Sequence, residues 1–177
     1  MLRFVSAILA LTLTGLAEPA MSECRGVSLK EGADLTFGQL RYHADEKTGW
    51  VSISPNGAIT TSRGLSVSTK SRWRPGTVQI KLPARSETLI RLQPIADIDR
   101  DDNLSSLELE IHSAGATIAK LADDTFSVAL DDVGDDRGQP GTVELIVTGT
   151  LLLKSFPRWS SQLSHRFQIT CLGTTVR

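Results

Sequence analysis

The residues best suited to chemistry lie in one acidic segment of the chain, residues 97–108. The side chains proposed as metal ligands are Asp97, Asp99, Asp101, Asn103 and Glu108. Calcium takes about six to eight hard oxygen ligands, and carboxylates at this spacing let a loop of EF-hand type wrap one ion. Asp102, however, stands where such a loop needs Gly for its sharp turn. Two interpretations therefore stand: a calcium site, or a solvated acidic turn in which Asp and Asn are favoured.

Histidine, serine and glycine residues do not form a recognisable catalytic motif in this sequence. The histidines, His43, His112 and His165, are scattered, and none has a partner at metal-ligand spacing. The sequence contains neither a Gly-x-Ser-x-Gly elbow nor a phosphate-binding glycine loop. We therefore expect that the chain is not an enzyme and that calcium is the one candidate cofactor.

The two cysteines, Cys24 and Cys171, stand near opposite ends of the chain. An even pair in an exported chain predicts one disulfide, with two free thiols as the alternative. The bond would close a loop of about 147 residues, for which the loop-entropy model gives roughly 4–5 kcal/mol. Because bonded Cα atoms lie within about 7 Å of each other, the first and last strands should lie side by side or face to face.

The first residues have the layout of a secretory signal. Arg3 precedes an almost unbroken apolar run, residues 4–16, and small residues precede the expected cleavage after Ala17, with Ala20 as a second option. A transmembrane helix needs roughly 20 apolar residues, and this run is shorter. Residues 1–17 are therefore the expected signal, and residues 18–177 the expected single domain, secreted and without a transmembrane segment.

The charge of the mature chain is nearly balanced. Loss of Arg3 lowers the basic residues from 19 to 18 against 20 acidic ones, a net charge of −2. Proteins that bind nucleic acid need a strong basic excess, so this balance argues against a nucleic-acid partner.

The elements that must position these residues are predicted to be strands. Apolar residues alternate with polar ones in ten segments: 35–40, 50–54, 58–62, 65–69, 78–82, 88–92, 107–111, 126–130, 143–153 and 165–171. Pro55-Asn56-Gly57 predicts a tight hairpin, and Gly149 predicts a bulge. A short helix is an alternative only for residues 114–122. About nine to eleven strands with turns every 8–12 residues or so predict an all-β, immunoglobulin-like antiparallel β-sandwich.

Several short motifs occur in an order that is similar to one known family. The matching pieces are Leu35-Thr36-Phe37-Gly38, Val51-Ser52-Ile53-Ser54-Pro55-Asn56-Gly57 with Thr60-Thr61-Ser62, Ile90-Arg91-Leu92-Gln93-Pro94, Phe126-Ser127-Val128, Thr148-Gly149-Thr150-Leu151 and Phe167-Gln168-Ile169-Thr170. They resemble domain-of-unknown-function family 4402, a bacterial family of secreted domains related to the major subunit of a common enterobacterial pilus.

The resemblance implies an immunoglobulin-like sandwich and a fimbria-related role at the cell surface or in the periplasm. We therefore expect a pilin-like structural or adhesion protein that acts through a protein partner or self-assembly. The alternative function is a calcium-stabilised β-sandwich module that binds a ligand. The two hypotheses differ in kind, because one is assembly and the other is ligand binding.

Overall fold

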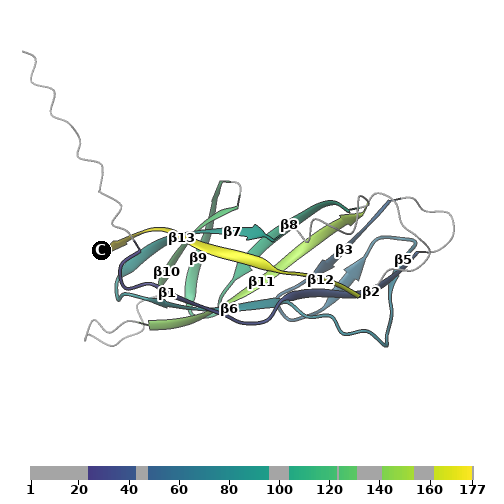
Figure 1. Ribbon diagram of the computed structural model, residues 1–177, viewed down its shortest axis with the longest axis horizontal. Coiled ribbons are helices and arrows are strands. Elements are labelled where there is room, and N and C mark those ends of the chain that lie inside the picture. Colours follow the sequence, from purple (N-terminus) through teal and green to yellow (C-terminus); the bar gives the residue numbers. More distant parts are fainter. Residues whose placement is uncertain are drawn as a thin grey trace, which may run out of the picture.

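The computed structural model describes residues 24–42, 48–95, 104–122, 124–130, 141–153 and 162–176. All regular structure in these residues is β-strand, and every strand pairing is antiparallel. The strands run along an elongated body in sheets that form a sandwich (Figure 1). The predicted all-β antiparallel sandwich is therefore confirmed. None of the described residues belongs to a helix of the length and hydropathy needed to cross a membrane.

The largest sheet is organised around β11 (Gly141–Leu153). The first half of β11 pairs with β6 (Gly76–Leu82), and the second half pairs on the same edge with β3 (Gly49–Ile53). Its opposite edge pairs with β8 (Leu104–His112). The sheet is completed by β1 (Ser28–Glu31) beside β6 and β4 (Ile59–Thr61) beside β3.

Two smaller sheets complete the sandwich. The four-stranded sheet has the order β13 (Phe167–Val176), β7 (Ser86–Pro94), β10 (Thr125–Leu130), β9 (Ala116–Ala122). The three-stranded sheet has the order β12 (Gln162–His165), β2 (Leu35–Tyr42), β5 (Leu65–Val67). Only Arg166 separates β12 from β13, so the last segment of the chain passes from one sheet to the other. The N-terminal segment also changes sheets, between β1 and β2.

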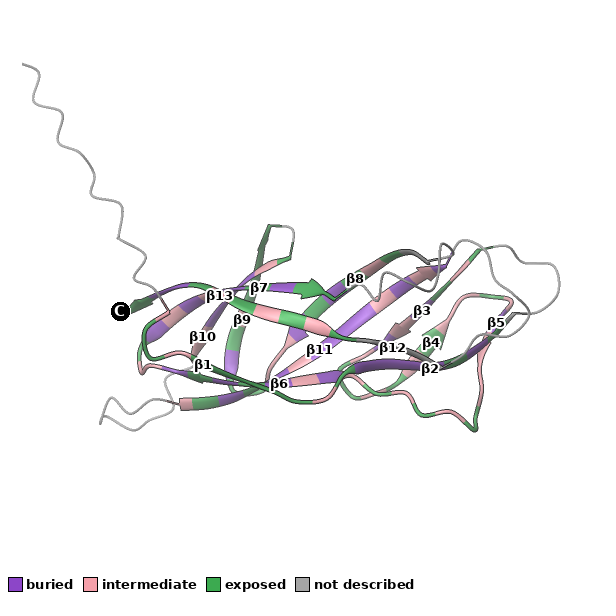
Figure 2. Cartoon of the chain, viewed as in Figure 1, coloured by how far each residue is buried: buried purple, intermediate pink, exposed green. Residues whose placement is uncertain are grey.

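The core follows from the alternation of the strands. In β6, Gly76, Val78, Ile80 and Leu82 are buried while the residues between them are at least partly exposed. β2 is instead buried continuously from Leu35 to Gly38, and buried positions recur along β11 (Figure 2). Inward side chains from all three sheets form one cluster, which includes Phe37, Val51, Leu92, Phe126 and Leu145. One continuous core therefore holds the sheets together and fixes where their edges meet.

The predicted hairpin at Pro55-Asn56-Gly57 is confirmed. The Gly57 amide donates to the Ser54 carbonyl over 2.9 Å, the Ser54 amide donates to the Ala58 carbonyl over 2.9 Å, and Gly57 has a φ of 78°. Glycine adopts this left-handed conformation without steric cost. The Asn56 carboxamide oxygen accepts from the Ala58 amide at 3.1 Å, so the side chain reinforces the turn.

One local prediction is wrong, and one alternative is excluded. The helix considered as an alternative for residues 114–122 does not form, because residues 116–122 are β9, which pairs with β10 from Ala116 to Ala122 with one register shift and buries Ala116. Gly149 is not a bulge, because it pairs in regular register with Ile53 on one side and Leu109 on the other. The register shift in this ladder lies between Leu152 and Leu153.

Candidate functional site

The disulfide determines where the two ends of the chain meet. Cys24 and Cys171 are bonded, with a Cα–Cα distance of 6.1 Å across a sequence separation of 147 residues. A short turn, in which the Val27 amide donates to the Cys24 carbonyl over 3.3 Å, leads from the bond into β1. The predicted pairing, and the predicted proximity of the first and last strands, are therefore confirmed.

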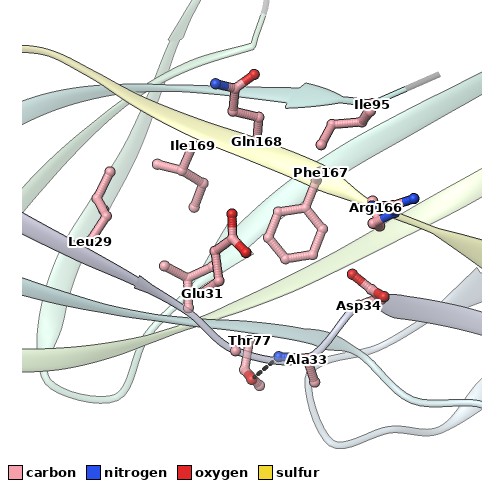
Figure 3. Close-up of a pocket in the computed structure, with 12 residues that line it drawn as sticks. Leu29, Glu31, Ala33, Asp34, Thr77, Ile95, Arg166, Phe167, Gln168 and Ile169 are labelled. Carbon is pink, nitrogen blue, oxygen red and sulfur yellow. Dashed lines mark hydrogen bonds between the residues drawn. The ribbon is translucent and has the colours of Figure 1, made fainter.

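Beyond the disulfide, β1 and β13 border a cleft of about 260 Å³. β1 is the edge strand of the largest sheet, and β13 is the edge strand of the four-stranded sheet. We call this cleft the seam, because it lies where two different sheets meet without pairing (Figure 3). Its lining includes Leu29, Glu31, Val78, Ile95, Phe167 and Ile169.

The lining of the seam combines apolar side chains with polar ones. The side chains of Leu29 and Ile169 lie between the two strands, and the ring of Phe167 lies beside them (Figure 3). Phe167 packs closely on β6, because a Cβ at Gly76 would collide with its ring. Leu29 is 37% exposed and Ile95 is 45% exposed, so part of this apolar surface faces solvent. The seam therefore exposes apolar surface that a partner could cover.

Three charged side chains surround the seam at the end away from the disulfide. Glu31 points between the strands, while Asp34 and Arg166 lie at the junctions that lead into β2 and β13 (Figure 3). Within the described part of the chain, none of the three forms an ion pair. All three are exposed, so each is free to interact with a charge on an incoming molecule.

The base of the seam is held firmly by the junction between β1 and β2. The Ala33 amide donates to Thr77 Oγ1 over 3.0 Å, and the Thr77 amide donates to the Ala33 carbonyl over 2.8 Å (Figure 3). At the other strand, the Ile95 amide donates to the Arg166 carbonyl over 2.8 Å. These bonds fix the two walls of the seam before any partner binds.

The disulfide closes the seam at one end. A strand inserted between two others requires about 9.6 Å between its neighbours, which is twice the usual strand spacing. The Cα atoms of Cys24 and Cys171 are only 6.1 Å apart. At the disulfide there is therefore no room for an added strand between β1 and β13.

Most of the predicted calcium ligands lie outside the described residues, namely Asp97, Asp99, Asp101 and Asn103. Glu108 is described, and it lies on β8 in a second, shallow hollow of about 200 Å³ over β3, β8 and β11. The strands before and after the acidic segment are β7 and β8. They include residues 88–92 and 107–111, where alternating apolar and polar side chains predict strands. Among the described residues, no three His, Cys, Asp or Glu side chains are grouped as metal ligands.

The second hollow is a polar sheet surface. His112 Nε2 lies 3.0 Å from the buried Thr148 hydroxyl and 3.5 Å from Glu110 Oε2. On the neighbouring strands the Thr150 hydroxyl donates to Ser52 Oγ over 3.1 Å. These side chains therefore contact one another across the three strands.

Sequence reasoning missed the seam. Leu29, Phe167 and Ile169 look like ordinary members of alternating strands, and nothing local marks them as the lining of a cleft. The cysteine pair was the only useful signal, because it requires the strands after Cys24 and around Cys171 to be neighbours.

Comparison with protein-family models, with curated proteins and with solved structures gave no match to this chain.

Proposed function

We propose that this chain is an exported, pilin-like structural or adhesion protein that acts by holding a segment of another protein in the seam. The observation that carries the proposal is that, among the described residues, the outer edges of β1 and β13 are unpaired and border a cleft in which the apolar side chains of Leu29 and Ile95 are exposed. Free strand edges bind extended segments through main-chain hydrogen bonds, and pockets between the strands select side chains.

The size of the seam favours a protein ligand over a small molecule. Sites for drug-sized molecules usually measure roughly 300–1,000 Å³ and bury most of their ligand. The seam measures about 260 Å³ and is partly open to solvent. Such a volume suits one or two large apolar side chains of a partner, of the kind that anchor protein interfaces.

The disulfide and the N-terminal sequence support export. Stable disulfides form in oxidising compartments such as the periplasm and the cell exterior. The Cys24–Cys171 bond fits a periplasmic or surface location, as does the signal-like sequence of residues 1–17. The proposal therefore places the protein outside the cytoplasm, where it meets its partner after folding and oxidation.

Site-specific photocrosslinking tests the proposal. The photoreactive residue p-benzoylphenylalanine replaces Leu29 in the seam or, as a matched control, Leu121 on β9, which is an exposed leucine on the opposite edge of the four-stranded sheet. In cells that make the protein, we expect a defined crosslinked product from position 29 and none from position 121. An Ile169→Asp substitution in the position-29 chain should abolish that product. Equal crosslinking from both positions, or from neither, would contradict the proposal.

A further inference from the structure

Positive charge is concentrated in a part of the chain that lies mostly outside the seam. Residues 48–86 contain six Lys and Arg side chains and no Asp or Glu, whereas the whole chain has a net charge of −1. Arg63, Lys70, Arg72 and Arg74 flank β5, and all four are exposed. None of these four forms a salt bridge with another described residue. Their charges are therefore available to a partner of opposite sign.

The backbone between β5 and β6 is held against β2, at the end of the body opposite to the C-terminus (Figure 1). The Ser68 amide donates to the Gln39 carbonyl over 2.9 Å. Further along, the Arg74 amide donates to the Thr36 carbonyl over 2.8 Å, and the Thr36 amide donates to the Arg74 carbonyl over 3.0 Å. Residues 68–74 are therefore attached to β2 at both ends.

The middle of this segment fits closely over a glycine of β2. Gly38 has a φ of 78°, and a Cβ there would lie 2.7 Å from Ser71 Oγ. The Ser71 hydroxyl in turn donates to the Ser68 carbonyl over 2.7 Å. A segment that is already fixed in this way loses little conformational entropy when a ligand binds.

The arginines of the segment are directed outward because the residue between them is directed inward. Trp73 packs against the hydrophobic core, so the alternation of the backbone places Arg72 and Arg74 on the opposite side. On β2, Leu40 is buried in the core, and the same alternation places the exposed Arg41 on the outer side. We call the surface formed by Arg41, Arg72 and Arg74 the basic face.

The basic face is extended and does not converge on one point. Arg74 lies opposite Thr36, and Arg41 follows five residues later in β2. At about 3.3 Å per residue, Arg41 and Arg74 are separated by roughly 16 Å along the strand. A small anion cannot contact two groups at this distance, whereas a polymer with repeated negative charges can.

The surroundings of the basic face favour a hydrated polymer over nucleic acid or a membrane. Proteins that bind single-stranded nucleic acid stack bases on exposed aromatic rings, but Trp73 packs on the core. Surfaces that bind membranes combine basic residues with apolar side chains that enter the lipid. Among the described residues, no large exposed apolar side chain belongs to β2, β5 or residues 68–74. An anionic polysaccharide requires neither feature.

We propose that the basic face binds an anionic polysaccharide, and that the guanidinium groups of Arg41, Arg72 and Arg74 donate hydrogen bonds to its charged groups. Guanidinium groups suit this role because their donors form a rigid fork that pairs with the oxygens of an anion and stays charged at every physiological pH. This binding is independent of the proposed function, because the basic face and the seam share no residue.

A pair of dextran polymers tests the proposal with the unaltered protein. The probes are fluorescein-labelled dextran sulfate and neutral dextran of the same chain length. At about 50 mM salt we expect binding to dextran sulfate and none to dextran, with an affinity that falls as the salt concentration rises, because counterions compete for the polymer. No binding to dextran sulfate at this salt concentration, or equal binding to both polymers, would overturn the proposal.

Paired substitutions locate the binding surface. Arg72→Gln with Arg74→Gln should weaken binding about 30-fold, because each arginine beside an anionic surface changes the affinity about fivefold. Arg72→Lys with Arg74→Lys keeps the charge and should retain most of the affinity. The matched control, Lys81→Gln with Arg91→Gln, removes the same charge from exposed positions of β6 and β7 and should change the affinity less than about twofold, since distant charges are screened. Equal losses from the two glutamine pairs would overturn the proposal.

Two further ligands distinguish the polysaccharide from other anions. Phosphatidylglycerol vesicles should not sediment with the protein under conditions in which dextran sulfate binds. Sedimentation that the Arg72→Gln and Arg74→Gln pair abolishes would instead assign the basic face to a membrane, and tighter binding to a single-stranded oligonucleotide than to dextran sulfate would assign it to nucleic acid. Equal urea midpoints of the variants and the unaltered protein would show that any lost binding reflects charge and not unfolding.

Discussion

Gly149 provides the sharpest test of how the sheets pack. It lies in β11 between β3 and β8 and is opposite the buried residues Ile53 and Leu109. A Cβ at this position would lie 2.7 Å from the Glu108 carbonyl oxygen, 3.2 Å from Leu109 Cδ2 and 3.4 Å from Leu107 Cδ1. The closest of these atoms belongs to the backbone of β8. Gly149→Ala therefore requires the two strands to move apart, because no side-chain rotation can relieve the contact.

Two opposing effects set how much Gly149→Ala changes the free energy of unfolding. Overpacking of a well-filled core destabilises a protein by about 1–3 kcal/mol. Replacement of Gly by Ala also restricts the unfolded chain, which returns about 0.4–1 kcal/mol of stability. We expect Gly149→Ala to lower the free energy of unfolding by about 1–2 kcal/mol. For a domain of this size the melting temperature should fall by roughly 2–8 °C.

Urea unfolding, followed by tryptophan fluorescence, measures the effect. The matched control is Gly115→Ala, because a Cβ at Gly115 meets nothing within 4 Å and its φ is not positive. That control should be neutral or slightly stabilising. If Gly149→Ala were as stable as the unaltered protein, or as stable as Gly115→Ala, the inferred close approach of β8 to β11 would be refuted.

Three further predictions concern the core, a buried polar pair and the acidic segment. Leu145→Ala should lower the free energy of unfolding by about 2–5 kcal/mol, because Leu145 is fully buried, whereas Leu121→Ala should change it by less than about 0.5 kcal/mol; similar urea midpoints for the two would contradict this. Thr88→Val should lower the free energy of unfolding by about 1 kcal/mol, because it removes the buried hydroxyl contact with Thr174 at 3.2 Å. Calorimetry of Thr88→Val, Thr174→Val and the double variant should show that the effects of the two substitutions are not additive. Additive effects would contradict the contact. Calcium bound by Asp97, Asp99, Asp101, Asn103 and Glu108 should add about 2.7 kcal/mol at a free concentration 100-fold above Kd; melting curves that coincide in calcium and in chelator would assign the segment to a polar turn.

The local structure of this protein was predictable because it depends on short-range alternation. Residues 78–82 and 126–130 are strands because every second side chain is apolar and faces the core. The hairpin at residues 55–57 was predictable because Gly57 adopts a positive φ that other residues resist. The disulfide was predictable because the chain has two cysteines, which within one chain can pair only with each other.

The error at Gly149 arose because the role of this residue depends on a distant strand. Gly149 resembles a bulge in the sequence, but the close approach of the β8 backbone leaves no room for a Cβ there. The helix alternative for residues 114–122 concerned a segment rich in alanine, which suits a helix, yet pairing with β10 makes residues 116–122 a strand. In both cases the tertiary environment overrides a local preference.

The amino-acid sequence by itself determined that this chain forms antiparallel strands around one core and joins its ends through Cys24 and Cys171. Only the tertiary structure decided which sheet each strand enters. β1 and β2 are consecutive but belong to different sheets, as do β12 and β13. The alternation of side chains has the same period in every strand, so it indicates which face is buried and not which strand lies alongside. The seam exists because two such changes of sheet occur at the same edge of the sandwich, and that coincidence depends on contacts between residues far apart in the chain.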